Sequence, residues 1–331
     1  MATIRSRVLS GIQPTGRLHV GNYLGALKNF VTLQTDHDCL FMVADLHALT
    51  ESYNTKEKTA EIIDIIASYL AAGLNPKKCT LFLQSFVPAH AELAWILNTV
   101  TPMGELERMT QYKDKSARQP GNANVGLFTY PTLMAADILL YNGNLVPVGD
   151  DQTQHLELTR TVAKKFNTRY GAVFTVPMPL YTSVPRLMSL TDPNRKMSKS
   201  EPTGCLFLDD EPAIIKKKIA RAVTDSGTGD KNEVAAGVAN LFLLLDAFST
   251  PKVAAEFRAK QQSGTIRYSE LKETLANDIC VGLEDFQKKF LHLRSRPRAM
   301  LTTLRNGSKN AEKIALHTMK KVRQAIGLPS R

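Results

Sequence analysis

The chain has 331 residues, of which 43% are hydrophobic and 22% are charged, and its formal net charge is +11 at pH 7. This composition is typical of a globular protein and excludes an intrinsically disordered chain. No apolar run reaches the roughly 18–20 residues that span a bilayer, and residues 1–7 lack the apolar run of a signal peptide. We therefore expect a cytoplasmic protein without a membrane segment.

The charge is unevenly distributed. Residues 1–285 carry 30 Lys+Arg and 30 Asp+Glu, whereas residues 286–331 carry 12 Lys+Arg against the single acid Glu312. A neutral body with a cationic C-terminal end indicates a surface for a polyanion, and the alternative is a solvated basic face.

The four cysteines lie far apart in the sequence and form no Cys-x-x-Cys motif. A zinc site or a disulfide framework is therefore not expected, and buried thiols are.

Apolar runs alternate with helical patterns through the first 170 residues. We predict strands at 8–12, 39–44, 81–83 and 145–148, and helices from about 18, at 55–70, 89–100 and 130–141, and from about 149 to 170. The polar segment 111–125 is expected to be a mobile loop, and the proline-rich segment 176–205 is expected to be irregular. This alternation predicts an α/β fold with a Rossmann-like, doubly wound parallel sheet.

From residue 211 onward strand patterns disappear, and 241–248, 271–290 and 312–326 have helical spacing. We therefore predict a C-terminal helical bundle domain. The expected division is a nucleotide-binding catalytic domain at 1–205 and a helical domain at 206–331.

The stretch 10–23 reads Ser-Gly-Ile-Gln-Pro-Thr-Gly-Arg-Leu-His-Val-Gly-Asn-Tyr, a strand followed by a turn and a helix start. His19 and Asn22 are three residues apart, so both side chains project from one face near the helix N-terminus, where anions are favoured. Gly21 lacks a Cβ, which would let a flat base approach the backbone. Taken alone, the pattern is equally compatible with a structural helix cap.

A second motif, Lys-Met-Ser-Lys-Ser at 196–200, places two ammonium groups on a short segment. Lysine suits a moving contact with phosphate because it is a point charge on a long stem. The two motifs together resemble the nucleotide-binding motifs of class I aminoacyl-tRNA synthetases. Asn22, in place of a second histidine, is similar to the tryptophanyl branch. A lysine-rich surface loop is the alternative for the second motif alone.

This resemblance implies an enzyme that forms tryptophanyl-adenylate from L-tryptophan and ATP and transfers the tryptophan to tRNA(Trp). The implied catalytic residues are His19, Asn22, Lys115, Lys196 and Lys199. The implied ATP contacts are Gln13, Pro14, Thr15, Gly21, Asn22, Gly149, Asp150, Asp151, Leu187, Lys196, Met197, Ser198, Lys199 and Ser200. Magnesium is expected to arrive with ATP, and no dedicated protein metal site is predicted.

Tyr130, Met134 and Asp137 have the spacing of one helical face, and Asp137 is a carboxylate within an apolar run. A carboxylate that only accepts hydrogen bonds suits the indole N–H, which only donates, and Met134 is able to pack on the ring. A structural aspartate is the alternative. The resemblance adds Gln152 and His47 to the tryptophan contacts, although His47 is also compatible with a core position. Relatives usually have glutamate at position 150, so the shorter Asp150 favours a backbone contact with ribose over a side-chain contact.

The resemblance also implies a homodimer whose C-terminal helices bind tRNA. Three alternatives remain open: a tyrosyl-tRNA synthetase, a small-molecule nucleotidylyltransferase, and a catalytically silent paralogue that binds RNA. Asn22 and the run Met-Ala-Ala-Asp-Ile-Leu-Leu-Tyr at 134–141 favour tryptophan over tyrosine.

Overall fold

The computed structural model describes residues 5–118, 123–149, 152–181, 186–224 and 235–329. Its contacts group the chain into two compact units that are each discontinuous in sequence. Unit 1 comprises residues 1–15, 30–182 and 294–331, and unit 2 comprises residues 16–29 and 183–293. The boundaries of these units differ from the expected single division after residue 205, because each unit combines separate stretches of the chain. The assignment of separate functions to 1–205 and 206–331 stays a prediction.

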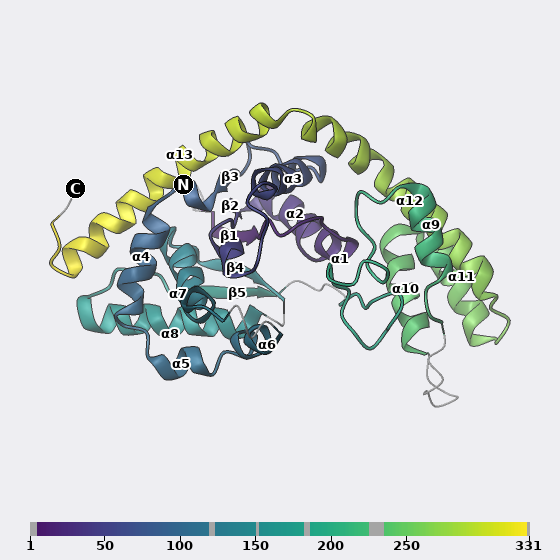
Figure 1. Ribbon diagram of the computed structural model, residues 1–331, viewed down its shortest axis with the longest axis horizontal. Helices are drawn as coiled ribbons and strands as arrows, with labels where there is room; N and C mark the ends of the chain where they lie inside the picture. Colours follow the sequence, from purple (N-terminus) through teal and green to yellow (C-terminus); the bar gives the residue numbers. More distant parts are fainter. Residues whose placement is uncertain (1–4, 119–122, 150–151, 182–185, 225–234, 330–331) are drawn as a thin grey trace. The chain divides into compact units, whose positions relative to one another are not determined.

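Unit 1 contains a five-stranded parallel sheet in the order β3-β2-β1-β4-β5 (Figure 1). Its strands are β1 (Arg7–Ile12), β2 (Asp38–Val43), β3 (Thr80–Leu83), β4 (Leu145–Val148) and β5 (Met178–Tyr181). The four expected strands are confirmed. The expectation of irregular structure was wrong for β5, a short edge strand that contains Pro179. Proline is tolerated at a sheet edge, so it does not exclude a strand there.

Helices cover both faces of the sheet (Figure 1). One face packs on α2 (Lys28–Asp36) and α3 (Lys58–Ala71), and the other on α4 (Ala89–Asn98), α7 (Val125–Leu140) and α8 (Thr153–Tyr170). Strand β2 has buried side chains on both faces of the sheet. Phe41 stacks on Phe30 of α2 at 4.3 Å between ring centroids, whereas Leu40 and Met42 pack on the other face, in the core formed with α4, α7 and α8. Side chains alternate along a strand, so an unbroken apolar run buries both faces. The predicted Rossmann-like α/β class is confirmed.

Two short helices precede α7, namely α5 (Met103–Glu107) and α6 (Thr110–Arg118). The expectation of a mobile loop from residue 111 was wrong for α6. The ring of Tyr112 packs edge-on against Phe128, with centroids 5.1 Å apart. This helix has few apolar residues, so its sequence lacks the periodic pattern that predicts a helix.

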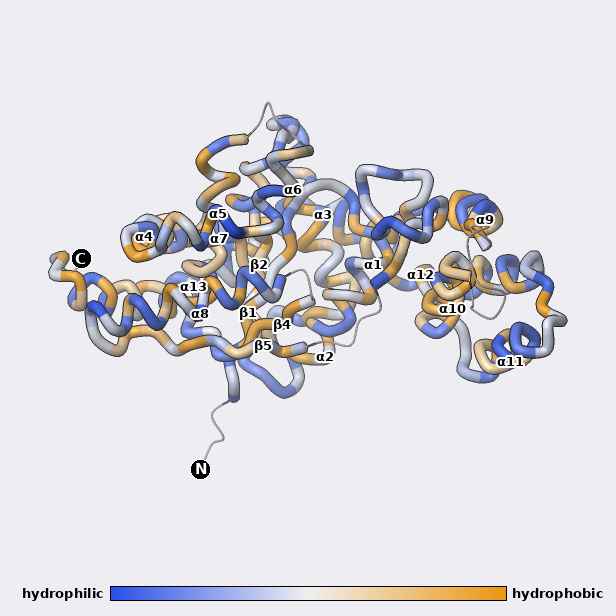
Figure 2. Tube along the Cα trace, turned by 90° about the horizontal axis from the view of Figure 1, so that it is seen from below, coloured by the Kyte–Doolittle hydropathy of each residue, from blue (hydrophilic) through white to orange (hydrophobic). Residues whose placement is uncertain are grey.

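The last helix, α13 (Pro297–Ala325), belongs to unit 1 and packs along β3 at the edge of the sheet (Figure 1). Ser308 Oγ accepts a hydrogen bond from the backbone N–H of Leu83 at 3.2 Å. A Cβ on Gly307 would lie only 1.8 Å from the carbonyl oxygen of Leu81. The helix therefore crosses the strand in close contact, and it covers an edge that would otherwise offer unpaired backbone groups. Figure 2 shows hydrophobic and hydrophilic residues alternating along α13.

Unit 2 is mainly helical in its described part. It contains α1 (Val20–Asn22), the π-helical turn η1 (Tyr23–Leu27), α9 (Pro212–Ala220), α10 (Ala236–Phe248), α11 (Pro251–Gln262) and α12 (Tyr268–Arg294). The expected C-terminal helices are confirmed with longer bounds. The ring of Tyr23 meets Phe286 of α12 at 5.8 Å, so α12 packs against the turn that follows α1. The predicted C-terminal bundle is therefore built by α9–α12, while α13 packs in unit 1.

Cys39, Cys79 and Cys205 are buried, as expected, and Cys280 is half-buried. Among the described residues, no helix combines the length and the apolar character needed to cross a membrane.

Candidate active site

The expected site residues fall into two groups, one in each unit. In unit 2, His19 caps the N-terminus of α1. Its Nδ1 accepts a hydrogen bond from the backbone N–H of Gly21 at 3.1 Å, and Asn22 Oδ1 accepts one from the backbone N–H of His19, also at 3.1 Å. These reciprocal bonds form a capping box. They fix both side chains and direct the Asn22 amide with its oxygen toward the backbone.

His19 is kept neutral by its surroundings. Burial lowers the pKa of its imidazole, and the nearby ammonium groups of Lys199 and Lys196 lower it further, to about 4. Because Nδ1 accepts from Gly21, the proton of the neutral ring is assigned to Nε2. His19 can therefore donate one hydrogen bond from Nε2 without carrying a charge.

Gly21 makes room for the ring of His19, a role that the sequence pattern did not predict. A Cβ at this position would lie 2.8 Å from Cε1 of His19. Such a contact is too short for any side chain, so the glycine makes room for the capping imidazole. The approach of a base to Gly21 stays a prediction.

The lysine motif is anchored by its second residue, Met197. Met197 is 3% exposed, and its backbone N–H donates to the carbonyl of Leu187 at 3.0 Å. Met188 and Lys196 form an antiparallel bridge, and the hydroxyls of Ser198 and Ser200 lie 2.9 Å apart. The side chains of Leu187 and Met197 face the core, so any contact with a nucleotide falls to their backbone. Lys196 is exposed and Lys199 is half-buried.

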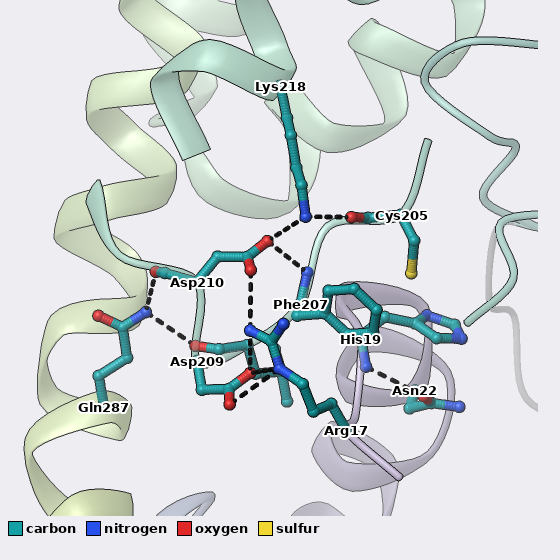
Figure 3. A network of polar contacts seen from close by, with 10 residues as sticks. Arg17, His19, Asn22, Cys205, Phe207, Asp209, Asp210, Lys218 and Gln287 are labelled. Atoms are coloured by element: carbon teal, nitrogen blue, oxygen red, sulfur yellow. Dashed lines mark hydrogen bonds and ion pairs between the residues drawn. The ribbon is translucent and has the colours of Figure 1, made fainter. Parts of the chain in front are cut away.

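A network of ionic contacts supports the His19 turn (Figure 3). Arg17 Nη2 donates to Asp210 Oδ1 at 2.8 Å, and Lys218 Nζ donates to Asp210 Oδ2 at 2.6 Å. The same Oδ2 accepts from the backbone N–H of Phe207, which forms a β-bridge with His19. Asp210 is 4% exposed and thereby ties the turn to the segment after the lysine motif. Sequence reasoning missed Asp210, although an acid after the apolar run 205–208 was a usable signal.

In unit 1, the buried carboxylate of Asp137 on α7 collects three donors. Oδ1 lies 2.6 Å from His90 Nδ1 and 2.8 Å from Gln84 Nε2, and Oδ2 lies 2.7 Å from His47 Nε2. His47 opens the 3-10 turn η2 (His47–Thr50), Gln84 opens η3 (Gln84–Phe86), and His90 lies on α4. Burial by itself raises the pKa of Asp137, but His47 and His90 together lower it to about 2. The carboxylate is therefore ionised.

Tyr130 and Met134 lie on the same helix as Asp137. The hydroxyl of Tyr130 is 2.7 Å from His155 Nε2, and its ring meets His47 edge-on at 6.2 Å between centroids. Burial raises the pKa of the Tyr130 phenol, so this hydroxyl keeps its proton. Met134 is half-buried. Tyr130, His47 and Asp137 are thus close to one another, and their role in binding tryptophan stays a prediction. Sequence reasoning missed His90 and Gln84 because they come from other segments, and it gave His155 no role.

The remaining expected contacts in unit 1 lie at the carboxyl ends of strands. Gln13, Pro14 and Thr15 follow β1, and the carbonyl of Pro14 accepts from Lys58 Nζ at 2.9 Å. Gly149 follows β4, the neighbour of β1, and Gln152 is half-buried at the start of α8. The strand order reverses between β1 and β4, and ligands of doubly wound sheets bind at such a point. Asp150 and Asp151 lie outside the described residues, as does the side chain of Lys115.

Comparison with known proteins identifies the family. A family model described as tRNA synthetases class I (W and Y) matches residues 1–280. The chain belongs to this family.

Curated relatives cover nearly the whole chain. The tryptophan–tRNA ligase of Caldanaerobacter subterraneus subsp. tengcongensis is 46% identical over 327 residues, which are 97% of this chain and 98% of that protein. The tryptophan–tRNA ligase of Clostridium perfringens is 43% identical over 328 residues, 97% of each.

Solved structures agree with these relatives. Tryptophanyl-tRNA synthetase from Campylobacter jejuni, complexed with ADP and tryptophan, has a TM-score of 0.84 at 36% identity and covers 97% of this chain and 100% of that one. The enzyme from Mycoplasma pneumoniae has a TM-score of 0.85 at 34% identity, with 98% and 99% covered. The predicted resemblance to the tryptophanyl branch of class I aminoacyl-tRNA synthetases is confirmed. Tyrosyl-tRNA synthetase from Archaeoglobus fulgidus, at 21% identity and a TM-score of 0.69, shows the shared fold alone.

Proposed function

We propose that this enzyme activates L-tryptophan with ATP to tryptophanyl-adenylate and transfers the tryptophan to tRNA(Trp). The observation that carries the choice of amino acid is the ionised, buried carboxylate of Asp137, which matches the indole N–H as an acceptor. The near full-length identity to two tryptophan–tRNA ligases supports the same choice.

In the first step, the carboxylate of tryptophan attacks the α-phosphorus of ATP and pyrophosphate leaves. Negative charge then develops on the phosphates, and such transfers depend on positioning and on stabilisation of that charge. We assign His19 Nε2–H and the Asn22 amide as donors to phosphate oxygens. Lys196, Lys199 and Lys115 are assigned as the cations that neutralise pyrophosphate.

The remaining ATP contacts are assigned to residues 13–15, Gly21, 149–151, Leu187, and the motif 196–200. Tyr130, Met134, His47 and Gln152 are assigned to tryptophan beside Asp137. Magnesium is proposed to enter with ATP. Within the described part of the chain, no group of three or more His, Cys, Asp or Glu residues is arranged to hold a metal ion.

In the second step, a ribose hydroxyl at the 3′ end of tRNA(Trp) attacks the acyl carbon of the adenylate, and AMP leaves. We propose that the cationic residues after position 286 contact the tRNA backbone, and that the protein acts in the cytoplasm, where tRNA is charged. The expected homodimer is also a proposal.

The deciding experiment is amino-acid-dependent exchange of pyrophosphate into ATP, measured with each of the twenty amino acids. We expect exchange with tryptophan at micromolar to millimolar concentrations and no comparable exchange with tyrosine. Exchange with tyrosine alone would favour the tyrosyl alternative. No exchange with any amino acid would favour a silent RNA-binding paralogue.

A further inference from the structure

The two oxygens of Asp137 differ in how many donors they hold. A carboxylate oxygen has two lone pairs, so it accepts two well-aligned hydrogen bonds. Oδ1 already has two donors, His90 Nδ1 at 2.6 Å and Gln84 Nε2 at 2.8 Å. Oδ2 has one donor in the described structure, His47 Nε2 at 2.7 Å. One further donor therefore fits Oδ2 and not Oδ1.

His90 lies between the carboxylate of Asp137 and the hydroxyl of Tyr141. Its Nε2 lies 2.7 Å from the hydroxyl of Tyr141, and both residues are fully buried. The carboxylate of Asp137 is ionised and only accepts hydrogen bonds, so His90 Nδ1 donates to Oδ1. Burial raises the pKa of Tyr141, so its hydroxyl stays protonated beside Nε2 and holds the far side of the ring.

Packing holds this arrangement in place. The His90 ring stacks on Phe82 of β3 at 6.0 Å with an interplanar angle of 22°, and Tyr141 packs edge-on against the same phenyl ring at 5.4 Å. Gln84 is also held at both ends, because its Oε1 accepts from the backbone N–H of Leu46 at 3.0 Å. Leu46 directly precedes His47. The Gln84 side chain therefore donates to Oδ1 and also holds the backbone next to His47, which is the donor to Oδ2.

We propose that His90, oriented by Tyr141, and Gln84 are positioning residues that occupy Oδ1 of Asp137 and leave one acceptor position on Oδ2 for the indole N–H. This inference rests on the proposed function, in which Asp137 reads that group. His90 and Gln84 then determine selectivity for tryptophan without touching it, because they prevent the carboxylate from turning its second oxygen toward the substrate. A buried polar partner of this kind rejects analogues that lack the matching donor.

The test compares tryptophan with 3-(benzothiophen-3-yl)alanine, which has sulfur in place of the indole N–H. Pyrophosphate exchange gives kcat/KM for both amino acids in the full-length protein. In His90→Leu we expect kcat/KM for tryptophan to fall about 10- to 100-fold, the range for one hydrogen bond to a charged group, through a raised KM. The analogue should change far less, so the tryptophan preference collapses while KM for ATP stays constant.

Three further variants separate positioning from general damage to the core. His90→Asn keeps an amide N–H near the place of Nδ1 and should recover part of the preference. Tyr141→Phe removes one oxygen and should lower the preference less than His90→Leu does. Leu93→Ala, a buried change on the same helix, should lower thermal stability and leave the preference intact.

An unchanged preference in both Tyr141→Phe and a folded His90→Leu, with circular dichroism like that of the unaltered protein, would overturn the inference and leave the proposed function standing. If His90→Leu does not fold, Tyr141→Phe and His90→Asn decide the question by the same ratio. The unaltered protein is measured first. Its failure to exchange with tryptophan would overturn the proposed function itself, and no preference over the analogue would remove Asp137 from recognition.

Discussion

His19 and Asp137 are both buried ionisable residues, and their neighbours give them opposite charge states. Burial disfavours the charged form of each. At His19 the nearby Lys199 and Lys196 add to this effect, so the imidazole is neutral. At Asp137 the N–H donors of His47 and His90 outweigh burial, so the carboxylate is charged. A neutral donor suits the developing charge of phosphate, whereas a charged acceptor suits an N–H group.

The lowered pKa of His19 predicts how the stability of the protein depends on pH. Its pKa is about 4 in the folded protein against 6.5 for an unperturbed histidine. The unfolded chain therefore binds the extra proton between these values, and the contribution of His19 to stability is complete above pH 6.5 and is lost as the pH falls through 4. Its upper limit is roughly 3 kcal/mol.

Nitrogen chemical shifts of the imidazole should show His19 neutral down to about pH 4.5. In unfolding experiments, the stability difference between the unaltered protein and His19→Gln should shrink from pH 7 to pH 4. A His19 that titrates near pH 6.5 in the folded state would contradict this account.

At the scale of elements, α13 shows how tertiary contacts assign a helix to its place. Its buried positions, which include Met300, Leu304, Ala311 and Met319, recur at helical spacing, so the sequence predicts a helix with one apolar face. That face packs against β3 through Gly307 and Ser308. The spacing itself does not tell which surface the face will cover.

The crossing of α13 and β3 predicts an unfavourable glycine-to-alanine change. Alanine is the better helix former by about 1 kcal/mol. A Cβ at Gly307 would nevertheless lie 1.8 Å from the carbonyl oxygen of Leu81. Overpacking of this kind typically costs about 1–3 kcal/mol, so we expect Gly307→Ala to lower the free energy of unfolding by about that amount or more. Asn306→Ala, at the exposed neighbouring position, should be within about 0.5 kcal/mol of the unaltered protein.

Urea unfolding of both variants measures the difference. Equal or higher stability of Gly307→Ala would show that the helix is not in close contact with the strand.

At the scale of the whole molecule, the cationic C-terminal end is shared by the two units. Residues 286–293 belong to unit 2 at the end of α12, whereas 294–331 belong to unit 1. Lys288 and Lys289 on α12 pair with Glu284 and Asp285. Arg305, Lys309 and Lys313 are exposed on α13. Truncation near residue 285 would therefore uncover β3, so substitutions on the surface give a cleaner test of tRNA binding.

We expect the triple change Arg305→Glu, Lys309→Glu and Lys313→Glu to weaken tRNA(Trp) binding and to reduce the dependence of affinity on salt. Removal of each cation that binds a phosphate should lower the slope of log affinity against log salt by about 0.7–0.9. Tryptophan-dependent pyrophosphate exchange should be unchanged, because these residues lie outside the proposed amino-acid and ATP contacts.

Lys288→Glu with Lys289→Glu tests the part of the same cationic end that lies on α12, where each lysine already has an acidic partner and a smaller change in the slope is expected. Filter binding across a salt series distinguishes the two surfaces. Equal slopes for the α13 variant and the unaltered protein would exclude α13 from the tRNA contact.

Local patterns in the chain were enough to predict most of the secondary structure and the family. Apolar runs predicted β1 to β4, periodicity predicted most helices, and the motifs around His19 and Lys196 predicted the class of enzyme. These patterns are readable because they depend on residues within a few turns of one another. The packing of α13 on β3, and the convergence of Gln84, His90 and Tyr141 around Asp137, became visible only in the folded chain. Those residues come from separate segments of the chain. The order of the parallel strands brings these segments together, and that order cannot be predicted from the spacing of residues within a segment.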